Sequence, residues 1–428
     1  MMTDFTNTVS RIRTGAFALS LGLFLASHAA RAGEDWPQFR GPRGNGHSDA
    51  TGLALTWSDT QNVKWKTAIP GEGWSSPVIL GNQVWMQTAL DNGKSLRAVC
   101  VDKTDGKLLH STEIFYVEAP EEKHALNSHA SPTPVLEGGR AYVFFGMYGA
   151  ACLDTATGKV LWKNTALKHD HDKNGPGSSP LLYGDLLILT CDGTEQQYLA
   201  ALDKQTGELK WKTIRSNAKE LAAKNFHLRK AYHTPEIIQV GGRDQLVSMG
   251  AFRVSGLEPL SGREIWAVDV PGFSNVPRPV FGEGLLFVAT GFMKPELWAI
   301  RPDGQGVVTK THVEWKLSKQ APAKPSPILV NGRLYVISDG GILSCLDAKS
   351  GKEVWSERLE GEYSASPIYA DGHLFFCNQR GVTTVVKPGD KLNKVATNTL
   401  PDGLMSSPAV SGKALFLRTK TQLYRIEK

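Results

Sequence analysis

The sequence predicts an all-β fold, an eight-bladed β-propeller made of four-stranded antiparallel blades. Three observations lead to it. A proline-anchored segment recurs eight times, a ten-residue segment containing Asp, Gly and Trp recurs between the copies, and the last copy is one strand short. The chain has 428 residues, enough for a large core, and many of its 43 Gly and 23 Pro stand at regular positions, so they punctuate structure.

The proline-anchored segment opens each unit as a short strand. It reads S-P or T-P followed by apolar residues, as in SSPVIL at Ser75 and PSPILV at Pro325. A Gly-centred turn, a second strand, a third strand ending in Leu-Asp and a fourth ending in Trp follow in order. The anchors lie 40 to 57 residues apart, the length of a four-stranded blade, at Pro77, Pro134, Pro180, Pro235, Pro279, Pro327, Pro367 and Pro408.

The ten-residue segment predicts a structural device. LDTATGKVLW spans Leu153 to Trp162, LDKQTGELKW spans Leu202 to Trp211, LDAKSGKEVW spans Leu346 to Trp355, and LEPLSGREIW at Leu257 is a looser copy. We expect the Asp side chain to bind backbone N–H groups in a tight turn and the Gly to adopt positive φ. The Trp would lie on the outer strand and pack on the next blade. A residue set repeated around a ring favours stacking over catalysis.

Some units depart from the pattern. His110 replaces the Trp in the first unit, Trp315 comes late in a stretched fifth unit, and VVKPGDKLNKV in the seventh has lost it. The one stretch compatible with a helix, Asn217 to Lys230, lies in a long connection.

The eighth unit predicts how the ring closes. After Ser406 only three strands fit, and the missing fourth is NVKWKTAI, Asn62 to Ile69, whose Trp65 matches the outer-strand Trp. Pairing this N-terminal strand with the C-terminal blade would remove the exposed edges. The expected organisation is a signal peptide over residues 1–32, an N-terminal extension over 33–61 and the propeller over 62–428.

The N-terminus has the features of a secretory signal. Arg11 and Arg13 precede an apolar run, Ala16 to Ala26, and Ala30-Arg31-Ala32 supplies a cleavage site near Ala32. The run is short for a bilayer, although an uncleaved anchor is the alternative. We expect a periplasmic or secreted monomer with no transmembrane segment after cleavage. The net charge of +6 and the lack of Lys/Arg runs argue against nucleic acid.

The five cysteines form no pattern of metal or haem attachment. None are adjacent and no C-x-x-C occurs. Cys100, Cys152 and Cys345 each stand two residues before the Asp of the repeated segment, whereas Cys191 and Cys377 end apolar runs. Small buried hydrophobic residues are favoured over disulfides.

The repeated segment resembles the A-x-D-x-x-T-G-x-x-x-W pattern of PQQ-type repeats, with ALDKQTGELKW at Ala201 the nearest copy. That pattern is typical of eight-bladed quinoprotein alcohol dehydrogenases and of the propeller lipoprotein of outer-membrane assembly. DWPQFRGPRGNGHS, Asp35 to Ser48, is similar to the start of secreted PQQ-repeat proteins abundant in planctomycete-like bacteria. The resemblance covers roughly residues 36 to 428 and implies the propeller fold.

The dehydrogenases of this family imply a cofactor that the motifs here do not support. They carry an adjacent Cys-Cys disulfide over the cofactor and bind Ca²⁺ through a Glu, an Asn and often an Asp. This chain has no adjacent cysteines, and no motif matches those ligands. The cofactor is therefore left open: PQQ with Ca²⁺ is an alternative for which this sequence has no ligand motif. The sequence predicts no metal site.

The residues just upstream of the anchor prolines predict a site, because these segments converge on one mouth of a propeller channel. They are polar and do not repeat, and six of the eleven His fall there. For His129 and His233 the alternative is a hydrogen-bonded core histidine, and Arg229, Arg278 and Lys324 form either a cationic cluster for an anion or ordinary rim ion pairs. The candidate site is Trp74, Asn127, His129, Asn174, Arg229, His233, Asn275, Arg278 and Lys324.

These features favour an exported scaffold of the cell envelope that binds an envelope protein or a small anionic ligand. The alternative is a divergent quinoprotein oxidoreductase that uses PQQ and a divalent metal at the mouth. Carbohydrate hydrolysis is a third class, for which the sequence shows no suitably spaced pair of carboxylates. No catalytic residue is assigned.

Overall fold

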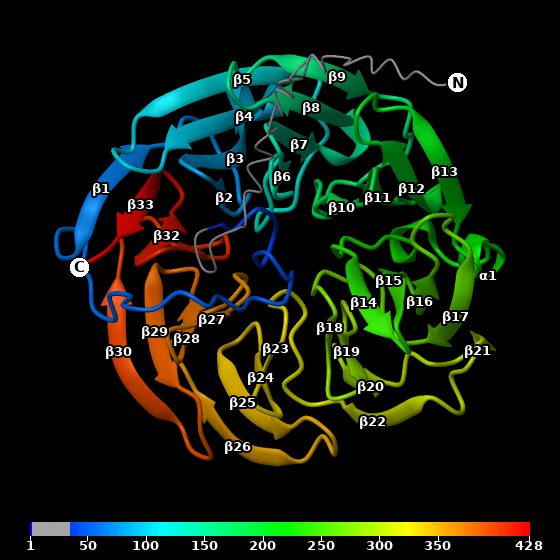
Figure 1. Ribbon diagram of the computed structural model, residues 1–428. Helices are drawn as coiled ribbons and strands as arrows, with labels where there is room; N and C mark the ends of the chain where they lie inside the picture. Colours follow the sequence, from blue (N-terminus) through cyan, green and yellow to red (C-terminus); the bar gives the residue numbers. More distant parts are fainter. Residues whose placement is uncertain (2–34) are drawn as a thin grey trace. The chain divides into compact units, whose positions relative to one another are not determined.

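The computed structural model describes residues 35–428, together with Met1. The predicted signal segment lies outside the described residues except for Met1. Residues 35–428 form eight antiparallel sheets arranged in a ring around a channel (Figure 1), which confirms the predicted fold. In this range no helix is long and apolar enough to cross a membrane.

Blades 1 to 4 follow one another along the chain, each with its innermost strand first. Blade 4 carries a fifth, parallel strand, β21 (Gly306–Val307), on its outer edge. The strands are β2 (Val78–Leu80), β3 (Gln83–Leu90), β4 (Ser95–Asp102) and β5 (Leu108–Tyr116); β6 (Val135–Glu137), β7 (Arg140–Phe144), β8 (Ala150–Asp154) and β9 (Val160–Asn164); β10 (Leu181–Tyr183), β11 (Leu186–Asp192), β12 (Gln197–Asp203) and β13 (Leu209–Ile214); β14 (Glu236–Val240), β15 (Arg243–Gly250), β16 (Arg253–Leu257) and β17 (Glu264–Asp269).

Blades 5 to 8 complete the ring, and the last takes its outer strand from the N-terminal part of the chain. The strands are β18 (Val280–Gly282), β19 (Leu285–Ala289), β20 (Leu297–Ile300) and β22 (Val313–Leu317); β23 (Ile328–Val330), β24 (Arg333–Ile337), β25 (Ile342–Asp347) and β26 (Glu353–Arg358); β27 (Ile368–Ala370), β28 (His373–Cys377), β29 (Val382–Lys387) and β30 (Asn393–Thr399); β31 (Ala409–Ser411), β32 (Ala414–Arg418), β33 (Gln422–Ile426) and β1 (Val63–Ala68).

Helical structure is confined to short connections. The stretch predicted as helix-compatible holds α1 (Ala218–Ala222) and the 3₁₀ turn η3 (Phe226–Leu228), and two further 3₁₀ turns are η1 (Asp91–Gly93) and η2 (Gly146–Tyr148). The core lies between adjacent blades: Tyr142 of blade 2, for example, packs in one cluster with Leu187 of blade 3. All five cysteines are buried and free, as expected.

The repeated ten-residue segment forms the turn between the third and fourth strands. Asp203 Oδ1 accepts the backbone N–H groups of Gln205 and Thr206 at 2.8 and 3.0 Å, and Gly207 has a φ of +77°. A Cβ at Gly207 would lie 2.5 Å from the ring of Trp162 in the preceding blade. The turn prediction is confirmed, and the Gly also leaves room for the neighbouring indole.

The outer-strand Trp residues link successive blades. The indole N–H of Trp162 donates to Lys204 O of blade 3 at 3.1 Å, and that of Trp315 donates to Ala348 O of blade 6 at 3.0 Å. Trp266 differs: it is fully buried and donates to Gln245 of its own blade. The stretched fifth unit explains this, because its extra residues place β21 along β17.

The residue before each anchor proline builds a ring of hydrogen bonds around the channel. In seven of eight blades it is Ser or Thr, and its hydroxyl oxygen accepts the N–H of the corresponding residue in the preceding blade. In blade 5 the position is Arg278. We call this ring the hydroxyl belt; its members are Ser76, Thr133, Ser179, Thr234, Ser326, Ser366 and Ser407.

The predicted closure is confirmed. β1 pairs antiparallel with β33, and Trp65 donates its indole N–H to Lys103 O of blade 1 at 3.0 Å. The belt continues across this seam between blades 8 and 1, because Ser407 N donates to Ser76 Oγ at 3.0 Å. Buried Arg418 also spans the seam, donating to the carbonyl oxygens of Ser75 and Gln87.

The segment before β1 closes the channel. Asp35 accepts the N–H of Gly81, and Asp371 accepts those of Gly52 and Leu53, at the turns after the innermost strands of blades 1 and 7. Between these points, residues 36–48 bond to the inner strands of blades 1, 2 and 7. In Figure 1 this dark-blue segment crosses the centre of the ring before it reaches β1. We call residues 35–53 the plug.

Candidate functional site

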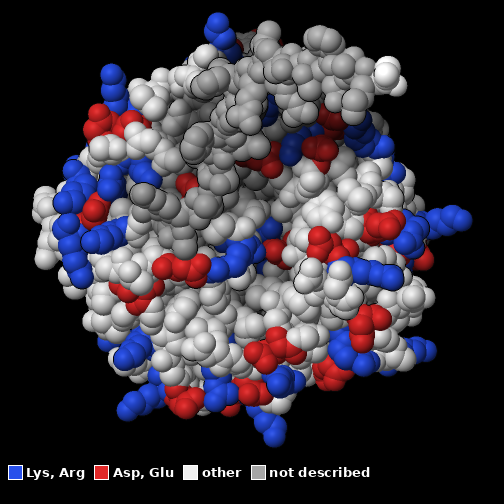
Figure 2. All heavy atoms as spheres, in the orientation of Figure 1, with Lys and Arg blue, Asp and Glu red and all other residues white. Residues whose placement is uncertain are grey.

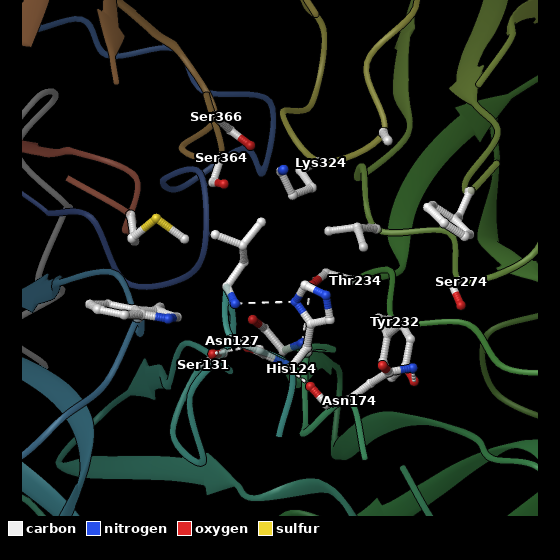
Figure 3. A pocket seen from close by; sticks show the side chains of 18 of the residues that line it. His124, Asn127, Ser131, Asn174, Tyr232, Thr234, Ser274, Lys324, Ser364 and Ser366 are labelled. Atoms are coloured by element: carbon white, nitrogen blue, oxygen red, sulfur yellow. Dashed lines mark hydrogen bonds between the residues drawn. The ribbon is translucent and has the colours of Figure 1, made fainter. Parts of the chain in front are cut away.

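A pocket of about 730 Å³ lies at the mouth where the innermost strands begin. All seven belt residues line it, and Phe39 of the plug reaches it from the other side of the channel. In Figure 3, Ser364, Ser366 and Lys324 face His124, Asn127 and Ser131 across an open space, with Thr234 and Tyr232 beside it. Its volume is in the range of small-molecule sites.

The connections after the outer strands of blades 1 and 2 build one wall. Asn127 joins the two connections, since its Nδ2 donates to Asn174 O at 2.6 Å and to Pro176 O at 3.1 Å. Its Oδ1 accepts the Ser131 hydroxyl at 2.5 Å. Every polar atom of the Asn127 side chain is therefore used to hold the wall in shape.

Two lysine–aspartate pairs lie in the pocket. Lys230 Nζ is 2.6 Å from Asp172 Oδ2, which also bonds to His227 Nδ1, and Lys324 Nζ is 2.9 Å from Asp339 Oδ2. Burial opposes ionisation of Asp172, but its bonds to Lys230 and His227 hold the pKa of its carboxyl below the ordinary value.

The rim of the pocket is apolar. Leu126, Val276 and Phe292 line it with 42, 37 and 58% of their surface exposed, and Met293, next to Phe292, is 73% exposed. Leu126 and Val276 come from connections before inner strands, whereas Phe292 and Met293 come from the loop between β19 and β20. Side chains of this kind, gathered at the opening of a cavity, are typical of a binding site.

A buried ionic cluster lies behind the belt at blade 5, where Arg278 stands in place of Ser or Thr. Arg278 Nε is 2.5 Å from Glu236 Oε2, and Arg278 Nη1 donates to Phe39 O at 2.6 Å. Arg40 of the plug donates through Nη2 to Pro327 O, while its Nε and Nη1 have no partner among the described residues. Burial raises the pKa of Glu236 to about 7 and lowers that of Arg40 to about 9, so the cluster is cationic at neutral pH.

Four of the nine residues predicted for the site line the pocket: Trp74, Asn127, Asn174 and Lys324. They come from the connections before inner strands, as the sequence argument required. The amide of Asn174 donates to Tyr232 Oη at 3.0 Å, and Lys324 is paired with Asp339, so each is held by a defined partner.

The other five lie outside the pocket lining, each held by its own hydrogen bonds. His233 is fully buried and accepts the N–H of Met249 at 2.9 Å, and Asn275 bonds to Gly250, the last residue of β15, and to Gly291 after β19. His129 Nε2 bonds to Glu121 O, and Arg229 donates to Ala222 and Lys224 carbonyls. Arg278 lies in the ionic cluster, so it forms no cationic group with Arg229 and Lys324.

The apolar rim and the belt were not predicted from the sequence. Phe292 and Met293 lie in a loop that no anchor proline marks. The belt did have a signal, because seven of the eight anchor prolines follow a Ser or Thr, but only its hydrogen bonds show why the hydroxyl recurs.

The pocket does not supply the donors that Ca²⁺ with PQQ would need. Its carboxylates, Asp172 and Asp339, are each neutralised by a lysine. Within residues 35–428 there is no group of three or more His, Cys, Asp or Glu arranged to hold a metal. Ca²⁺ binds through several carboxylate and carbonyl oxygens, so the residues present do not fit it.

Comparison with protein families identifies the repeat. The family described as outer membrane protein assembly factor BamB matches residues 117–246 and 310–417, which is more than half of the chain. The chain belongs to this family. The match covers blades from both halves of the ring. Curated proteins give no significant match.

Solved structures share the fold at low identity. BamB from Moraxella catarrhalis is 12% identical, with a TM-score of 0.57, and the match covers 85% of this chain and 99% of that one. A europium-containing methanol dehydrogenase is 12% identical with a TM-score of 0.67, covering 90% and 89%. The quinohemoprotein alcohol dehydrogenase ADHIIG from Pseudomonas putida HK5 is 10% identical with a TM-score of 0.63, covering 92% and 80%. These likenesses concern the fold alone.

Proposed function

We propose that this propeller is a binding scaffold of the cell envelope, and that its mouth pocket holds part of a protein partner or a small ligand. The observation that carries the proposal is the pocket: an apolar rim, a floor of hydroxyl groups and walls fixed by hydrogen bonds. Membership in the BamB family supports an assembly role, because that family is described as outer membrane protein assembly factors.

The chemistry of the pocket favours binding over catalysis. Its lysines and aspartates are paired with each other, and the polar atoms of Asn127 are bonded within the wall. Exposed apolar side chains at the rim give a partner surface to bury, at about 25 cal/mol per Å² of apolar area. The rim residues would therefore supply affinity, and the polar floor would supply specificity.

The rim is tested by changing Phe292 and Met293 to Ser in the exported protein. Both side chains project into solvent, so we expect folding to be unaffected and co-purification of envelope partners to fall at least tenfold. The matched control is Leu161→Ser on outer strand β9, which is 49% exposed. Equal partner recovery by the rim variant and the control would contradict a binding role for the mouth.

The quinoprotein alternative has its own test. PQQ is titrated into the protein with and without Ca²⁺ while tryptophan fluorescence is followed. Because the donors for Ca²⁺ are missing from the pocket, we expect no saturable binding at tens of micromolar and no effect of Ca²⁺. Saturable quenching that Ca²⁺ strengthens would favour the oxidoreductase.

Export is tested by sequencing the N-terminus of the protein recovered from the periplasm or medium. The apolar run and the Ala30-Arg31-Ala32 site lead us to expect a mature chain that begins after Ala32. Recovery of the intact N-terminus in a membrane fraction would instead support an uncleaved anchor.

A further inference from the structure

The hydroxyl belt presents a set of unused hydrogen-bond donors to the pocket. Each belt oxygen accepts a backbone N–H from the preceding blade, which leaves its own proton free to donate. Ser366 is different, because it donates to Ser326 Oγ at 3.0 Å. Among residues 35–428, the other six hydroxyl protons have no protein acceptor, and all six residues line the pocket: Ser76, Thr133, Ser179, Thr234, Ser326 and Ser407.

The buried positive charge behind the belt favours a negatively charged ligand, as the free hydroxyl donors favour a ligand with acceptor oxygens. Arg40 and Arg278 are both buried next to a single carboxylate, Glu236. Arginine stays protonated in proteins, so the cluster carries at least one net positive charge. The two lysine–aspartate pairs of the walls add none. A positive charge attracts an anion more strongly inside a protein site than in water, because the effective dielectric constant there is lower.

The walls also contribute more donors than acceptors. Lys324 and Lys230 each have ammonium protons beyond the one bonded to Asp, and the Trp74 indole N–H has no partner among the described residues. A ligand that satisfies this set must offer several oxygen acceptors, and a negative charge makes each hydrogen bond stronger.

From the free hydroxyl protons and the adjacent arginine pair, we propose that the pocket floor is a carboxylate-binding subsite. This deepens, and rests on, the proposed binding function. The ligand places its carboxylate against the belt near Arg278 and its apolar or ring portion against Trp74 and the rim. The carboxylate can come from an acidic small molecule or from the end of a peptide chain, and the experiment separates the two.

Two matched pairs of probes test the subsite by isothermal titration calorimetry. D-glucuronate is compared with D-glucose, and acetyl-Gly-Gly-Phe with a free C-terminus is compared with its C-terminal amide. We expect the acid of at least one pair to bind at least tenfold more tightly than its neutral partner. The pair with the higher affinity identifies the source. Equal binding within both pairs, or no binding of any probe, overturns the carboxylate assignment.

Variants of the belt separate ligand binding from blade packing. Ser179→Ala removes both an interblade acceptor and a free proton, so the preferred acid should bind about tenfold more weakly. Ser366→Ala removes a comparable acceptor, for Ser326 N, but no free proton, so affinity should change less than threefold. Equal effects of the two variants overturn a direct role for the hydroxyl protons.

Glu236→Gln tests the charge. The titration is run at pH 8, above the raised pKa of Glu236 of about 7, so that the carboxylate is mostly ionised in the wild type. The amide keeps the size of the side chain while the cluster gains nearly one net positive charge, so the acid should bind several-fold more tightly and its neutral partner should be unaffected. No change, or weaker binding of the acid, overturns the contribution of the buried positive charge to carboxylate binding. These results are independent of the rim experiment: loss of partners from the rim variant without any acid preference rejects only the subsite, whereas no rim effect rejects the binding function itself.

Discussion

At the scale of single residues, the buried His171 and His233 and the partly buried His169 make the fold sensitive to acid. Burial lowers the pKa of His169 to about 4 and holds those of His171 and His233 well below the ordinary value near 6.5. An unfolded chain therefore takes up these protons first as the pH falls. Their contribution to stability is complete above pH 6.5 and is lost progressively below it.

We expect the melting temperature to fall between pH 7.5 and pH 5, and His169→Gln to reduce that fall. Glutamine can still donate to Leu167 O, the present partner of His169 Nδ1, but it takes up no proton. The measurement is thermal unfolding at both pH values. Exposed His124→Gln is the control, and an identical pH dependence of the wild type and His169→Gln would contradict the assignment.

Glycine in the repeated turn is a residue-scale requirement of packing. Gly207→Ala would place a methyl group 2.5 Å from the Trp162 ring at positive φ, and we expect a loss of about 2 to 3 kcal/mol in the free energy of unfolding. Gly184→Ala also has positive φ but meets nothing within 4 Å, so about 1 kcal/mol is expected. Chemical denaturation measures both, and equal losses would show that backbone strain alone matters.

At the scale of the element, a belt hydroxyl joins seven of the eight pairs of neighbouring blades, and an outer-strand indole adds a second link at several of them. Trp162, Trp315 and Trp65 donate to the following blade, whereas the buried indole N–H of Trp211 has no partner among the described residues. Trp162 and Trp211 end the same repeated segment, so the difference between them arises from the local packing of each blade.

This difference predicts unequal effects of Trp-to-Phe substitutions. Trp162→Phe should cost about 1 kcal/mol more than Trp211→Phe, because only the first removes an interblade hydrogen bond and leaves a buried carbonyl without its donor. The free energy of unfolding from urea titrations is compared for the two variants. A larger loss for Trp211→Phe would be inconsistent with the indole bond as an interblade link.

At the scale of the whole molecule, ring closure was predictable and the pocket was predictable only in part. Eight anchors and a missing last strand define eight blades and a closing strand, because a blade needs four strands and a ring leaves no edge. Trp74, Asn127, Asn174 and Lys324 line the pocket because their segments precede inner strands. His233 and Asn275 stand equally near strand starts, but His233 bonds to Met249 within blade 4 and Asn275 bridges Gly250 of blade 4 and Gly291 of blade 5, a choice set by tertiary packing.

Closure itself is tested by deleting residues 62–69. The deletion exposes the edge of β33 and the face under Trp65, so we expect aggregation or loss of the cooperative unfolding transition. Size-exclusion chromatography and thermal unfolding measure both. A monomer as heat-stable as the full chain would exclude β1 as an essential part of the fold.

The plug and β1 also set the order in which the molecule can assemble. Both come from residues 35–68, yet their partners include Asp371 and the strand Gln422–Ile426, more than 300 residues later. Residues 35–68 are thus made before the rest of the propeller but dock last. Such distant contacts slow folding, since a long loop must close before they form. Until the final blade has formed, the plug cannot close the channel, and the early blades lack a neighbour on one side.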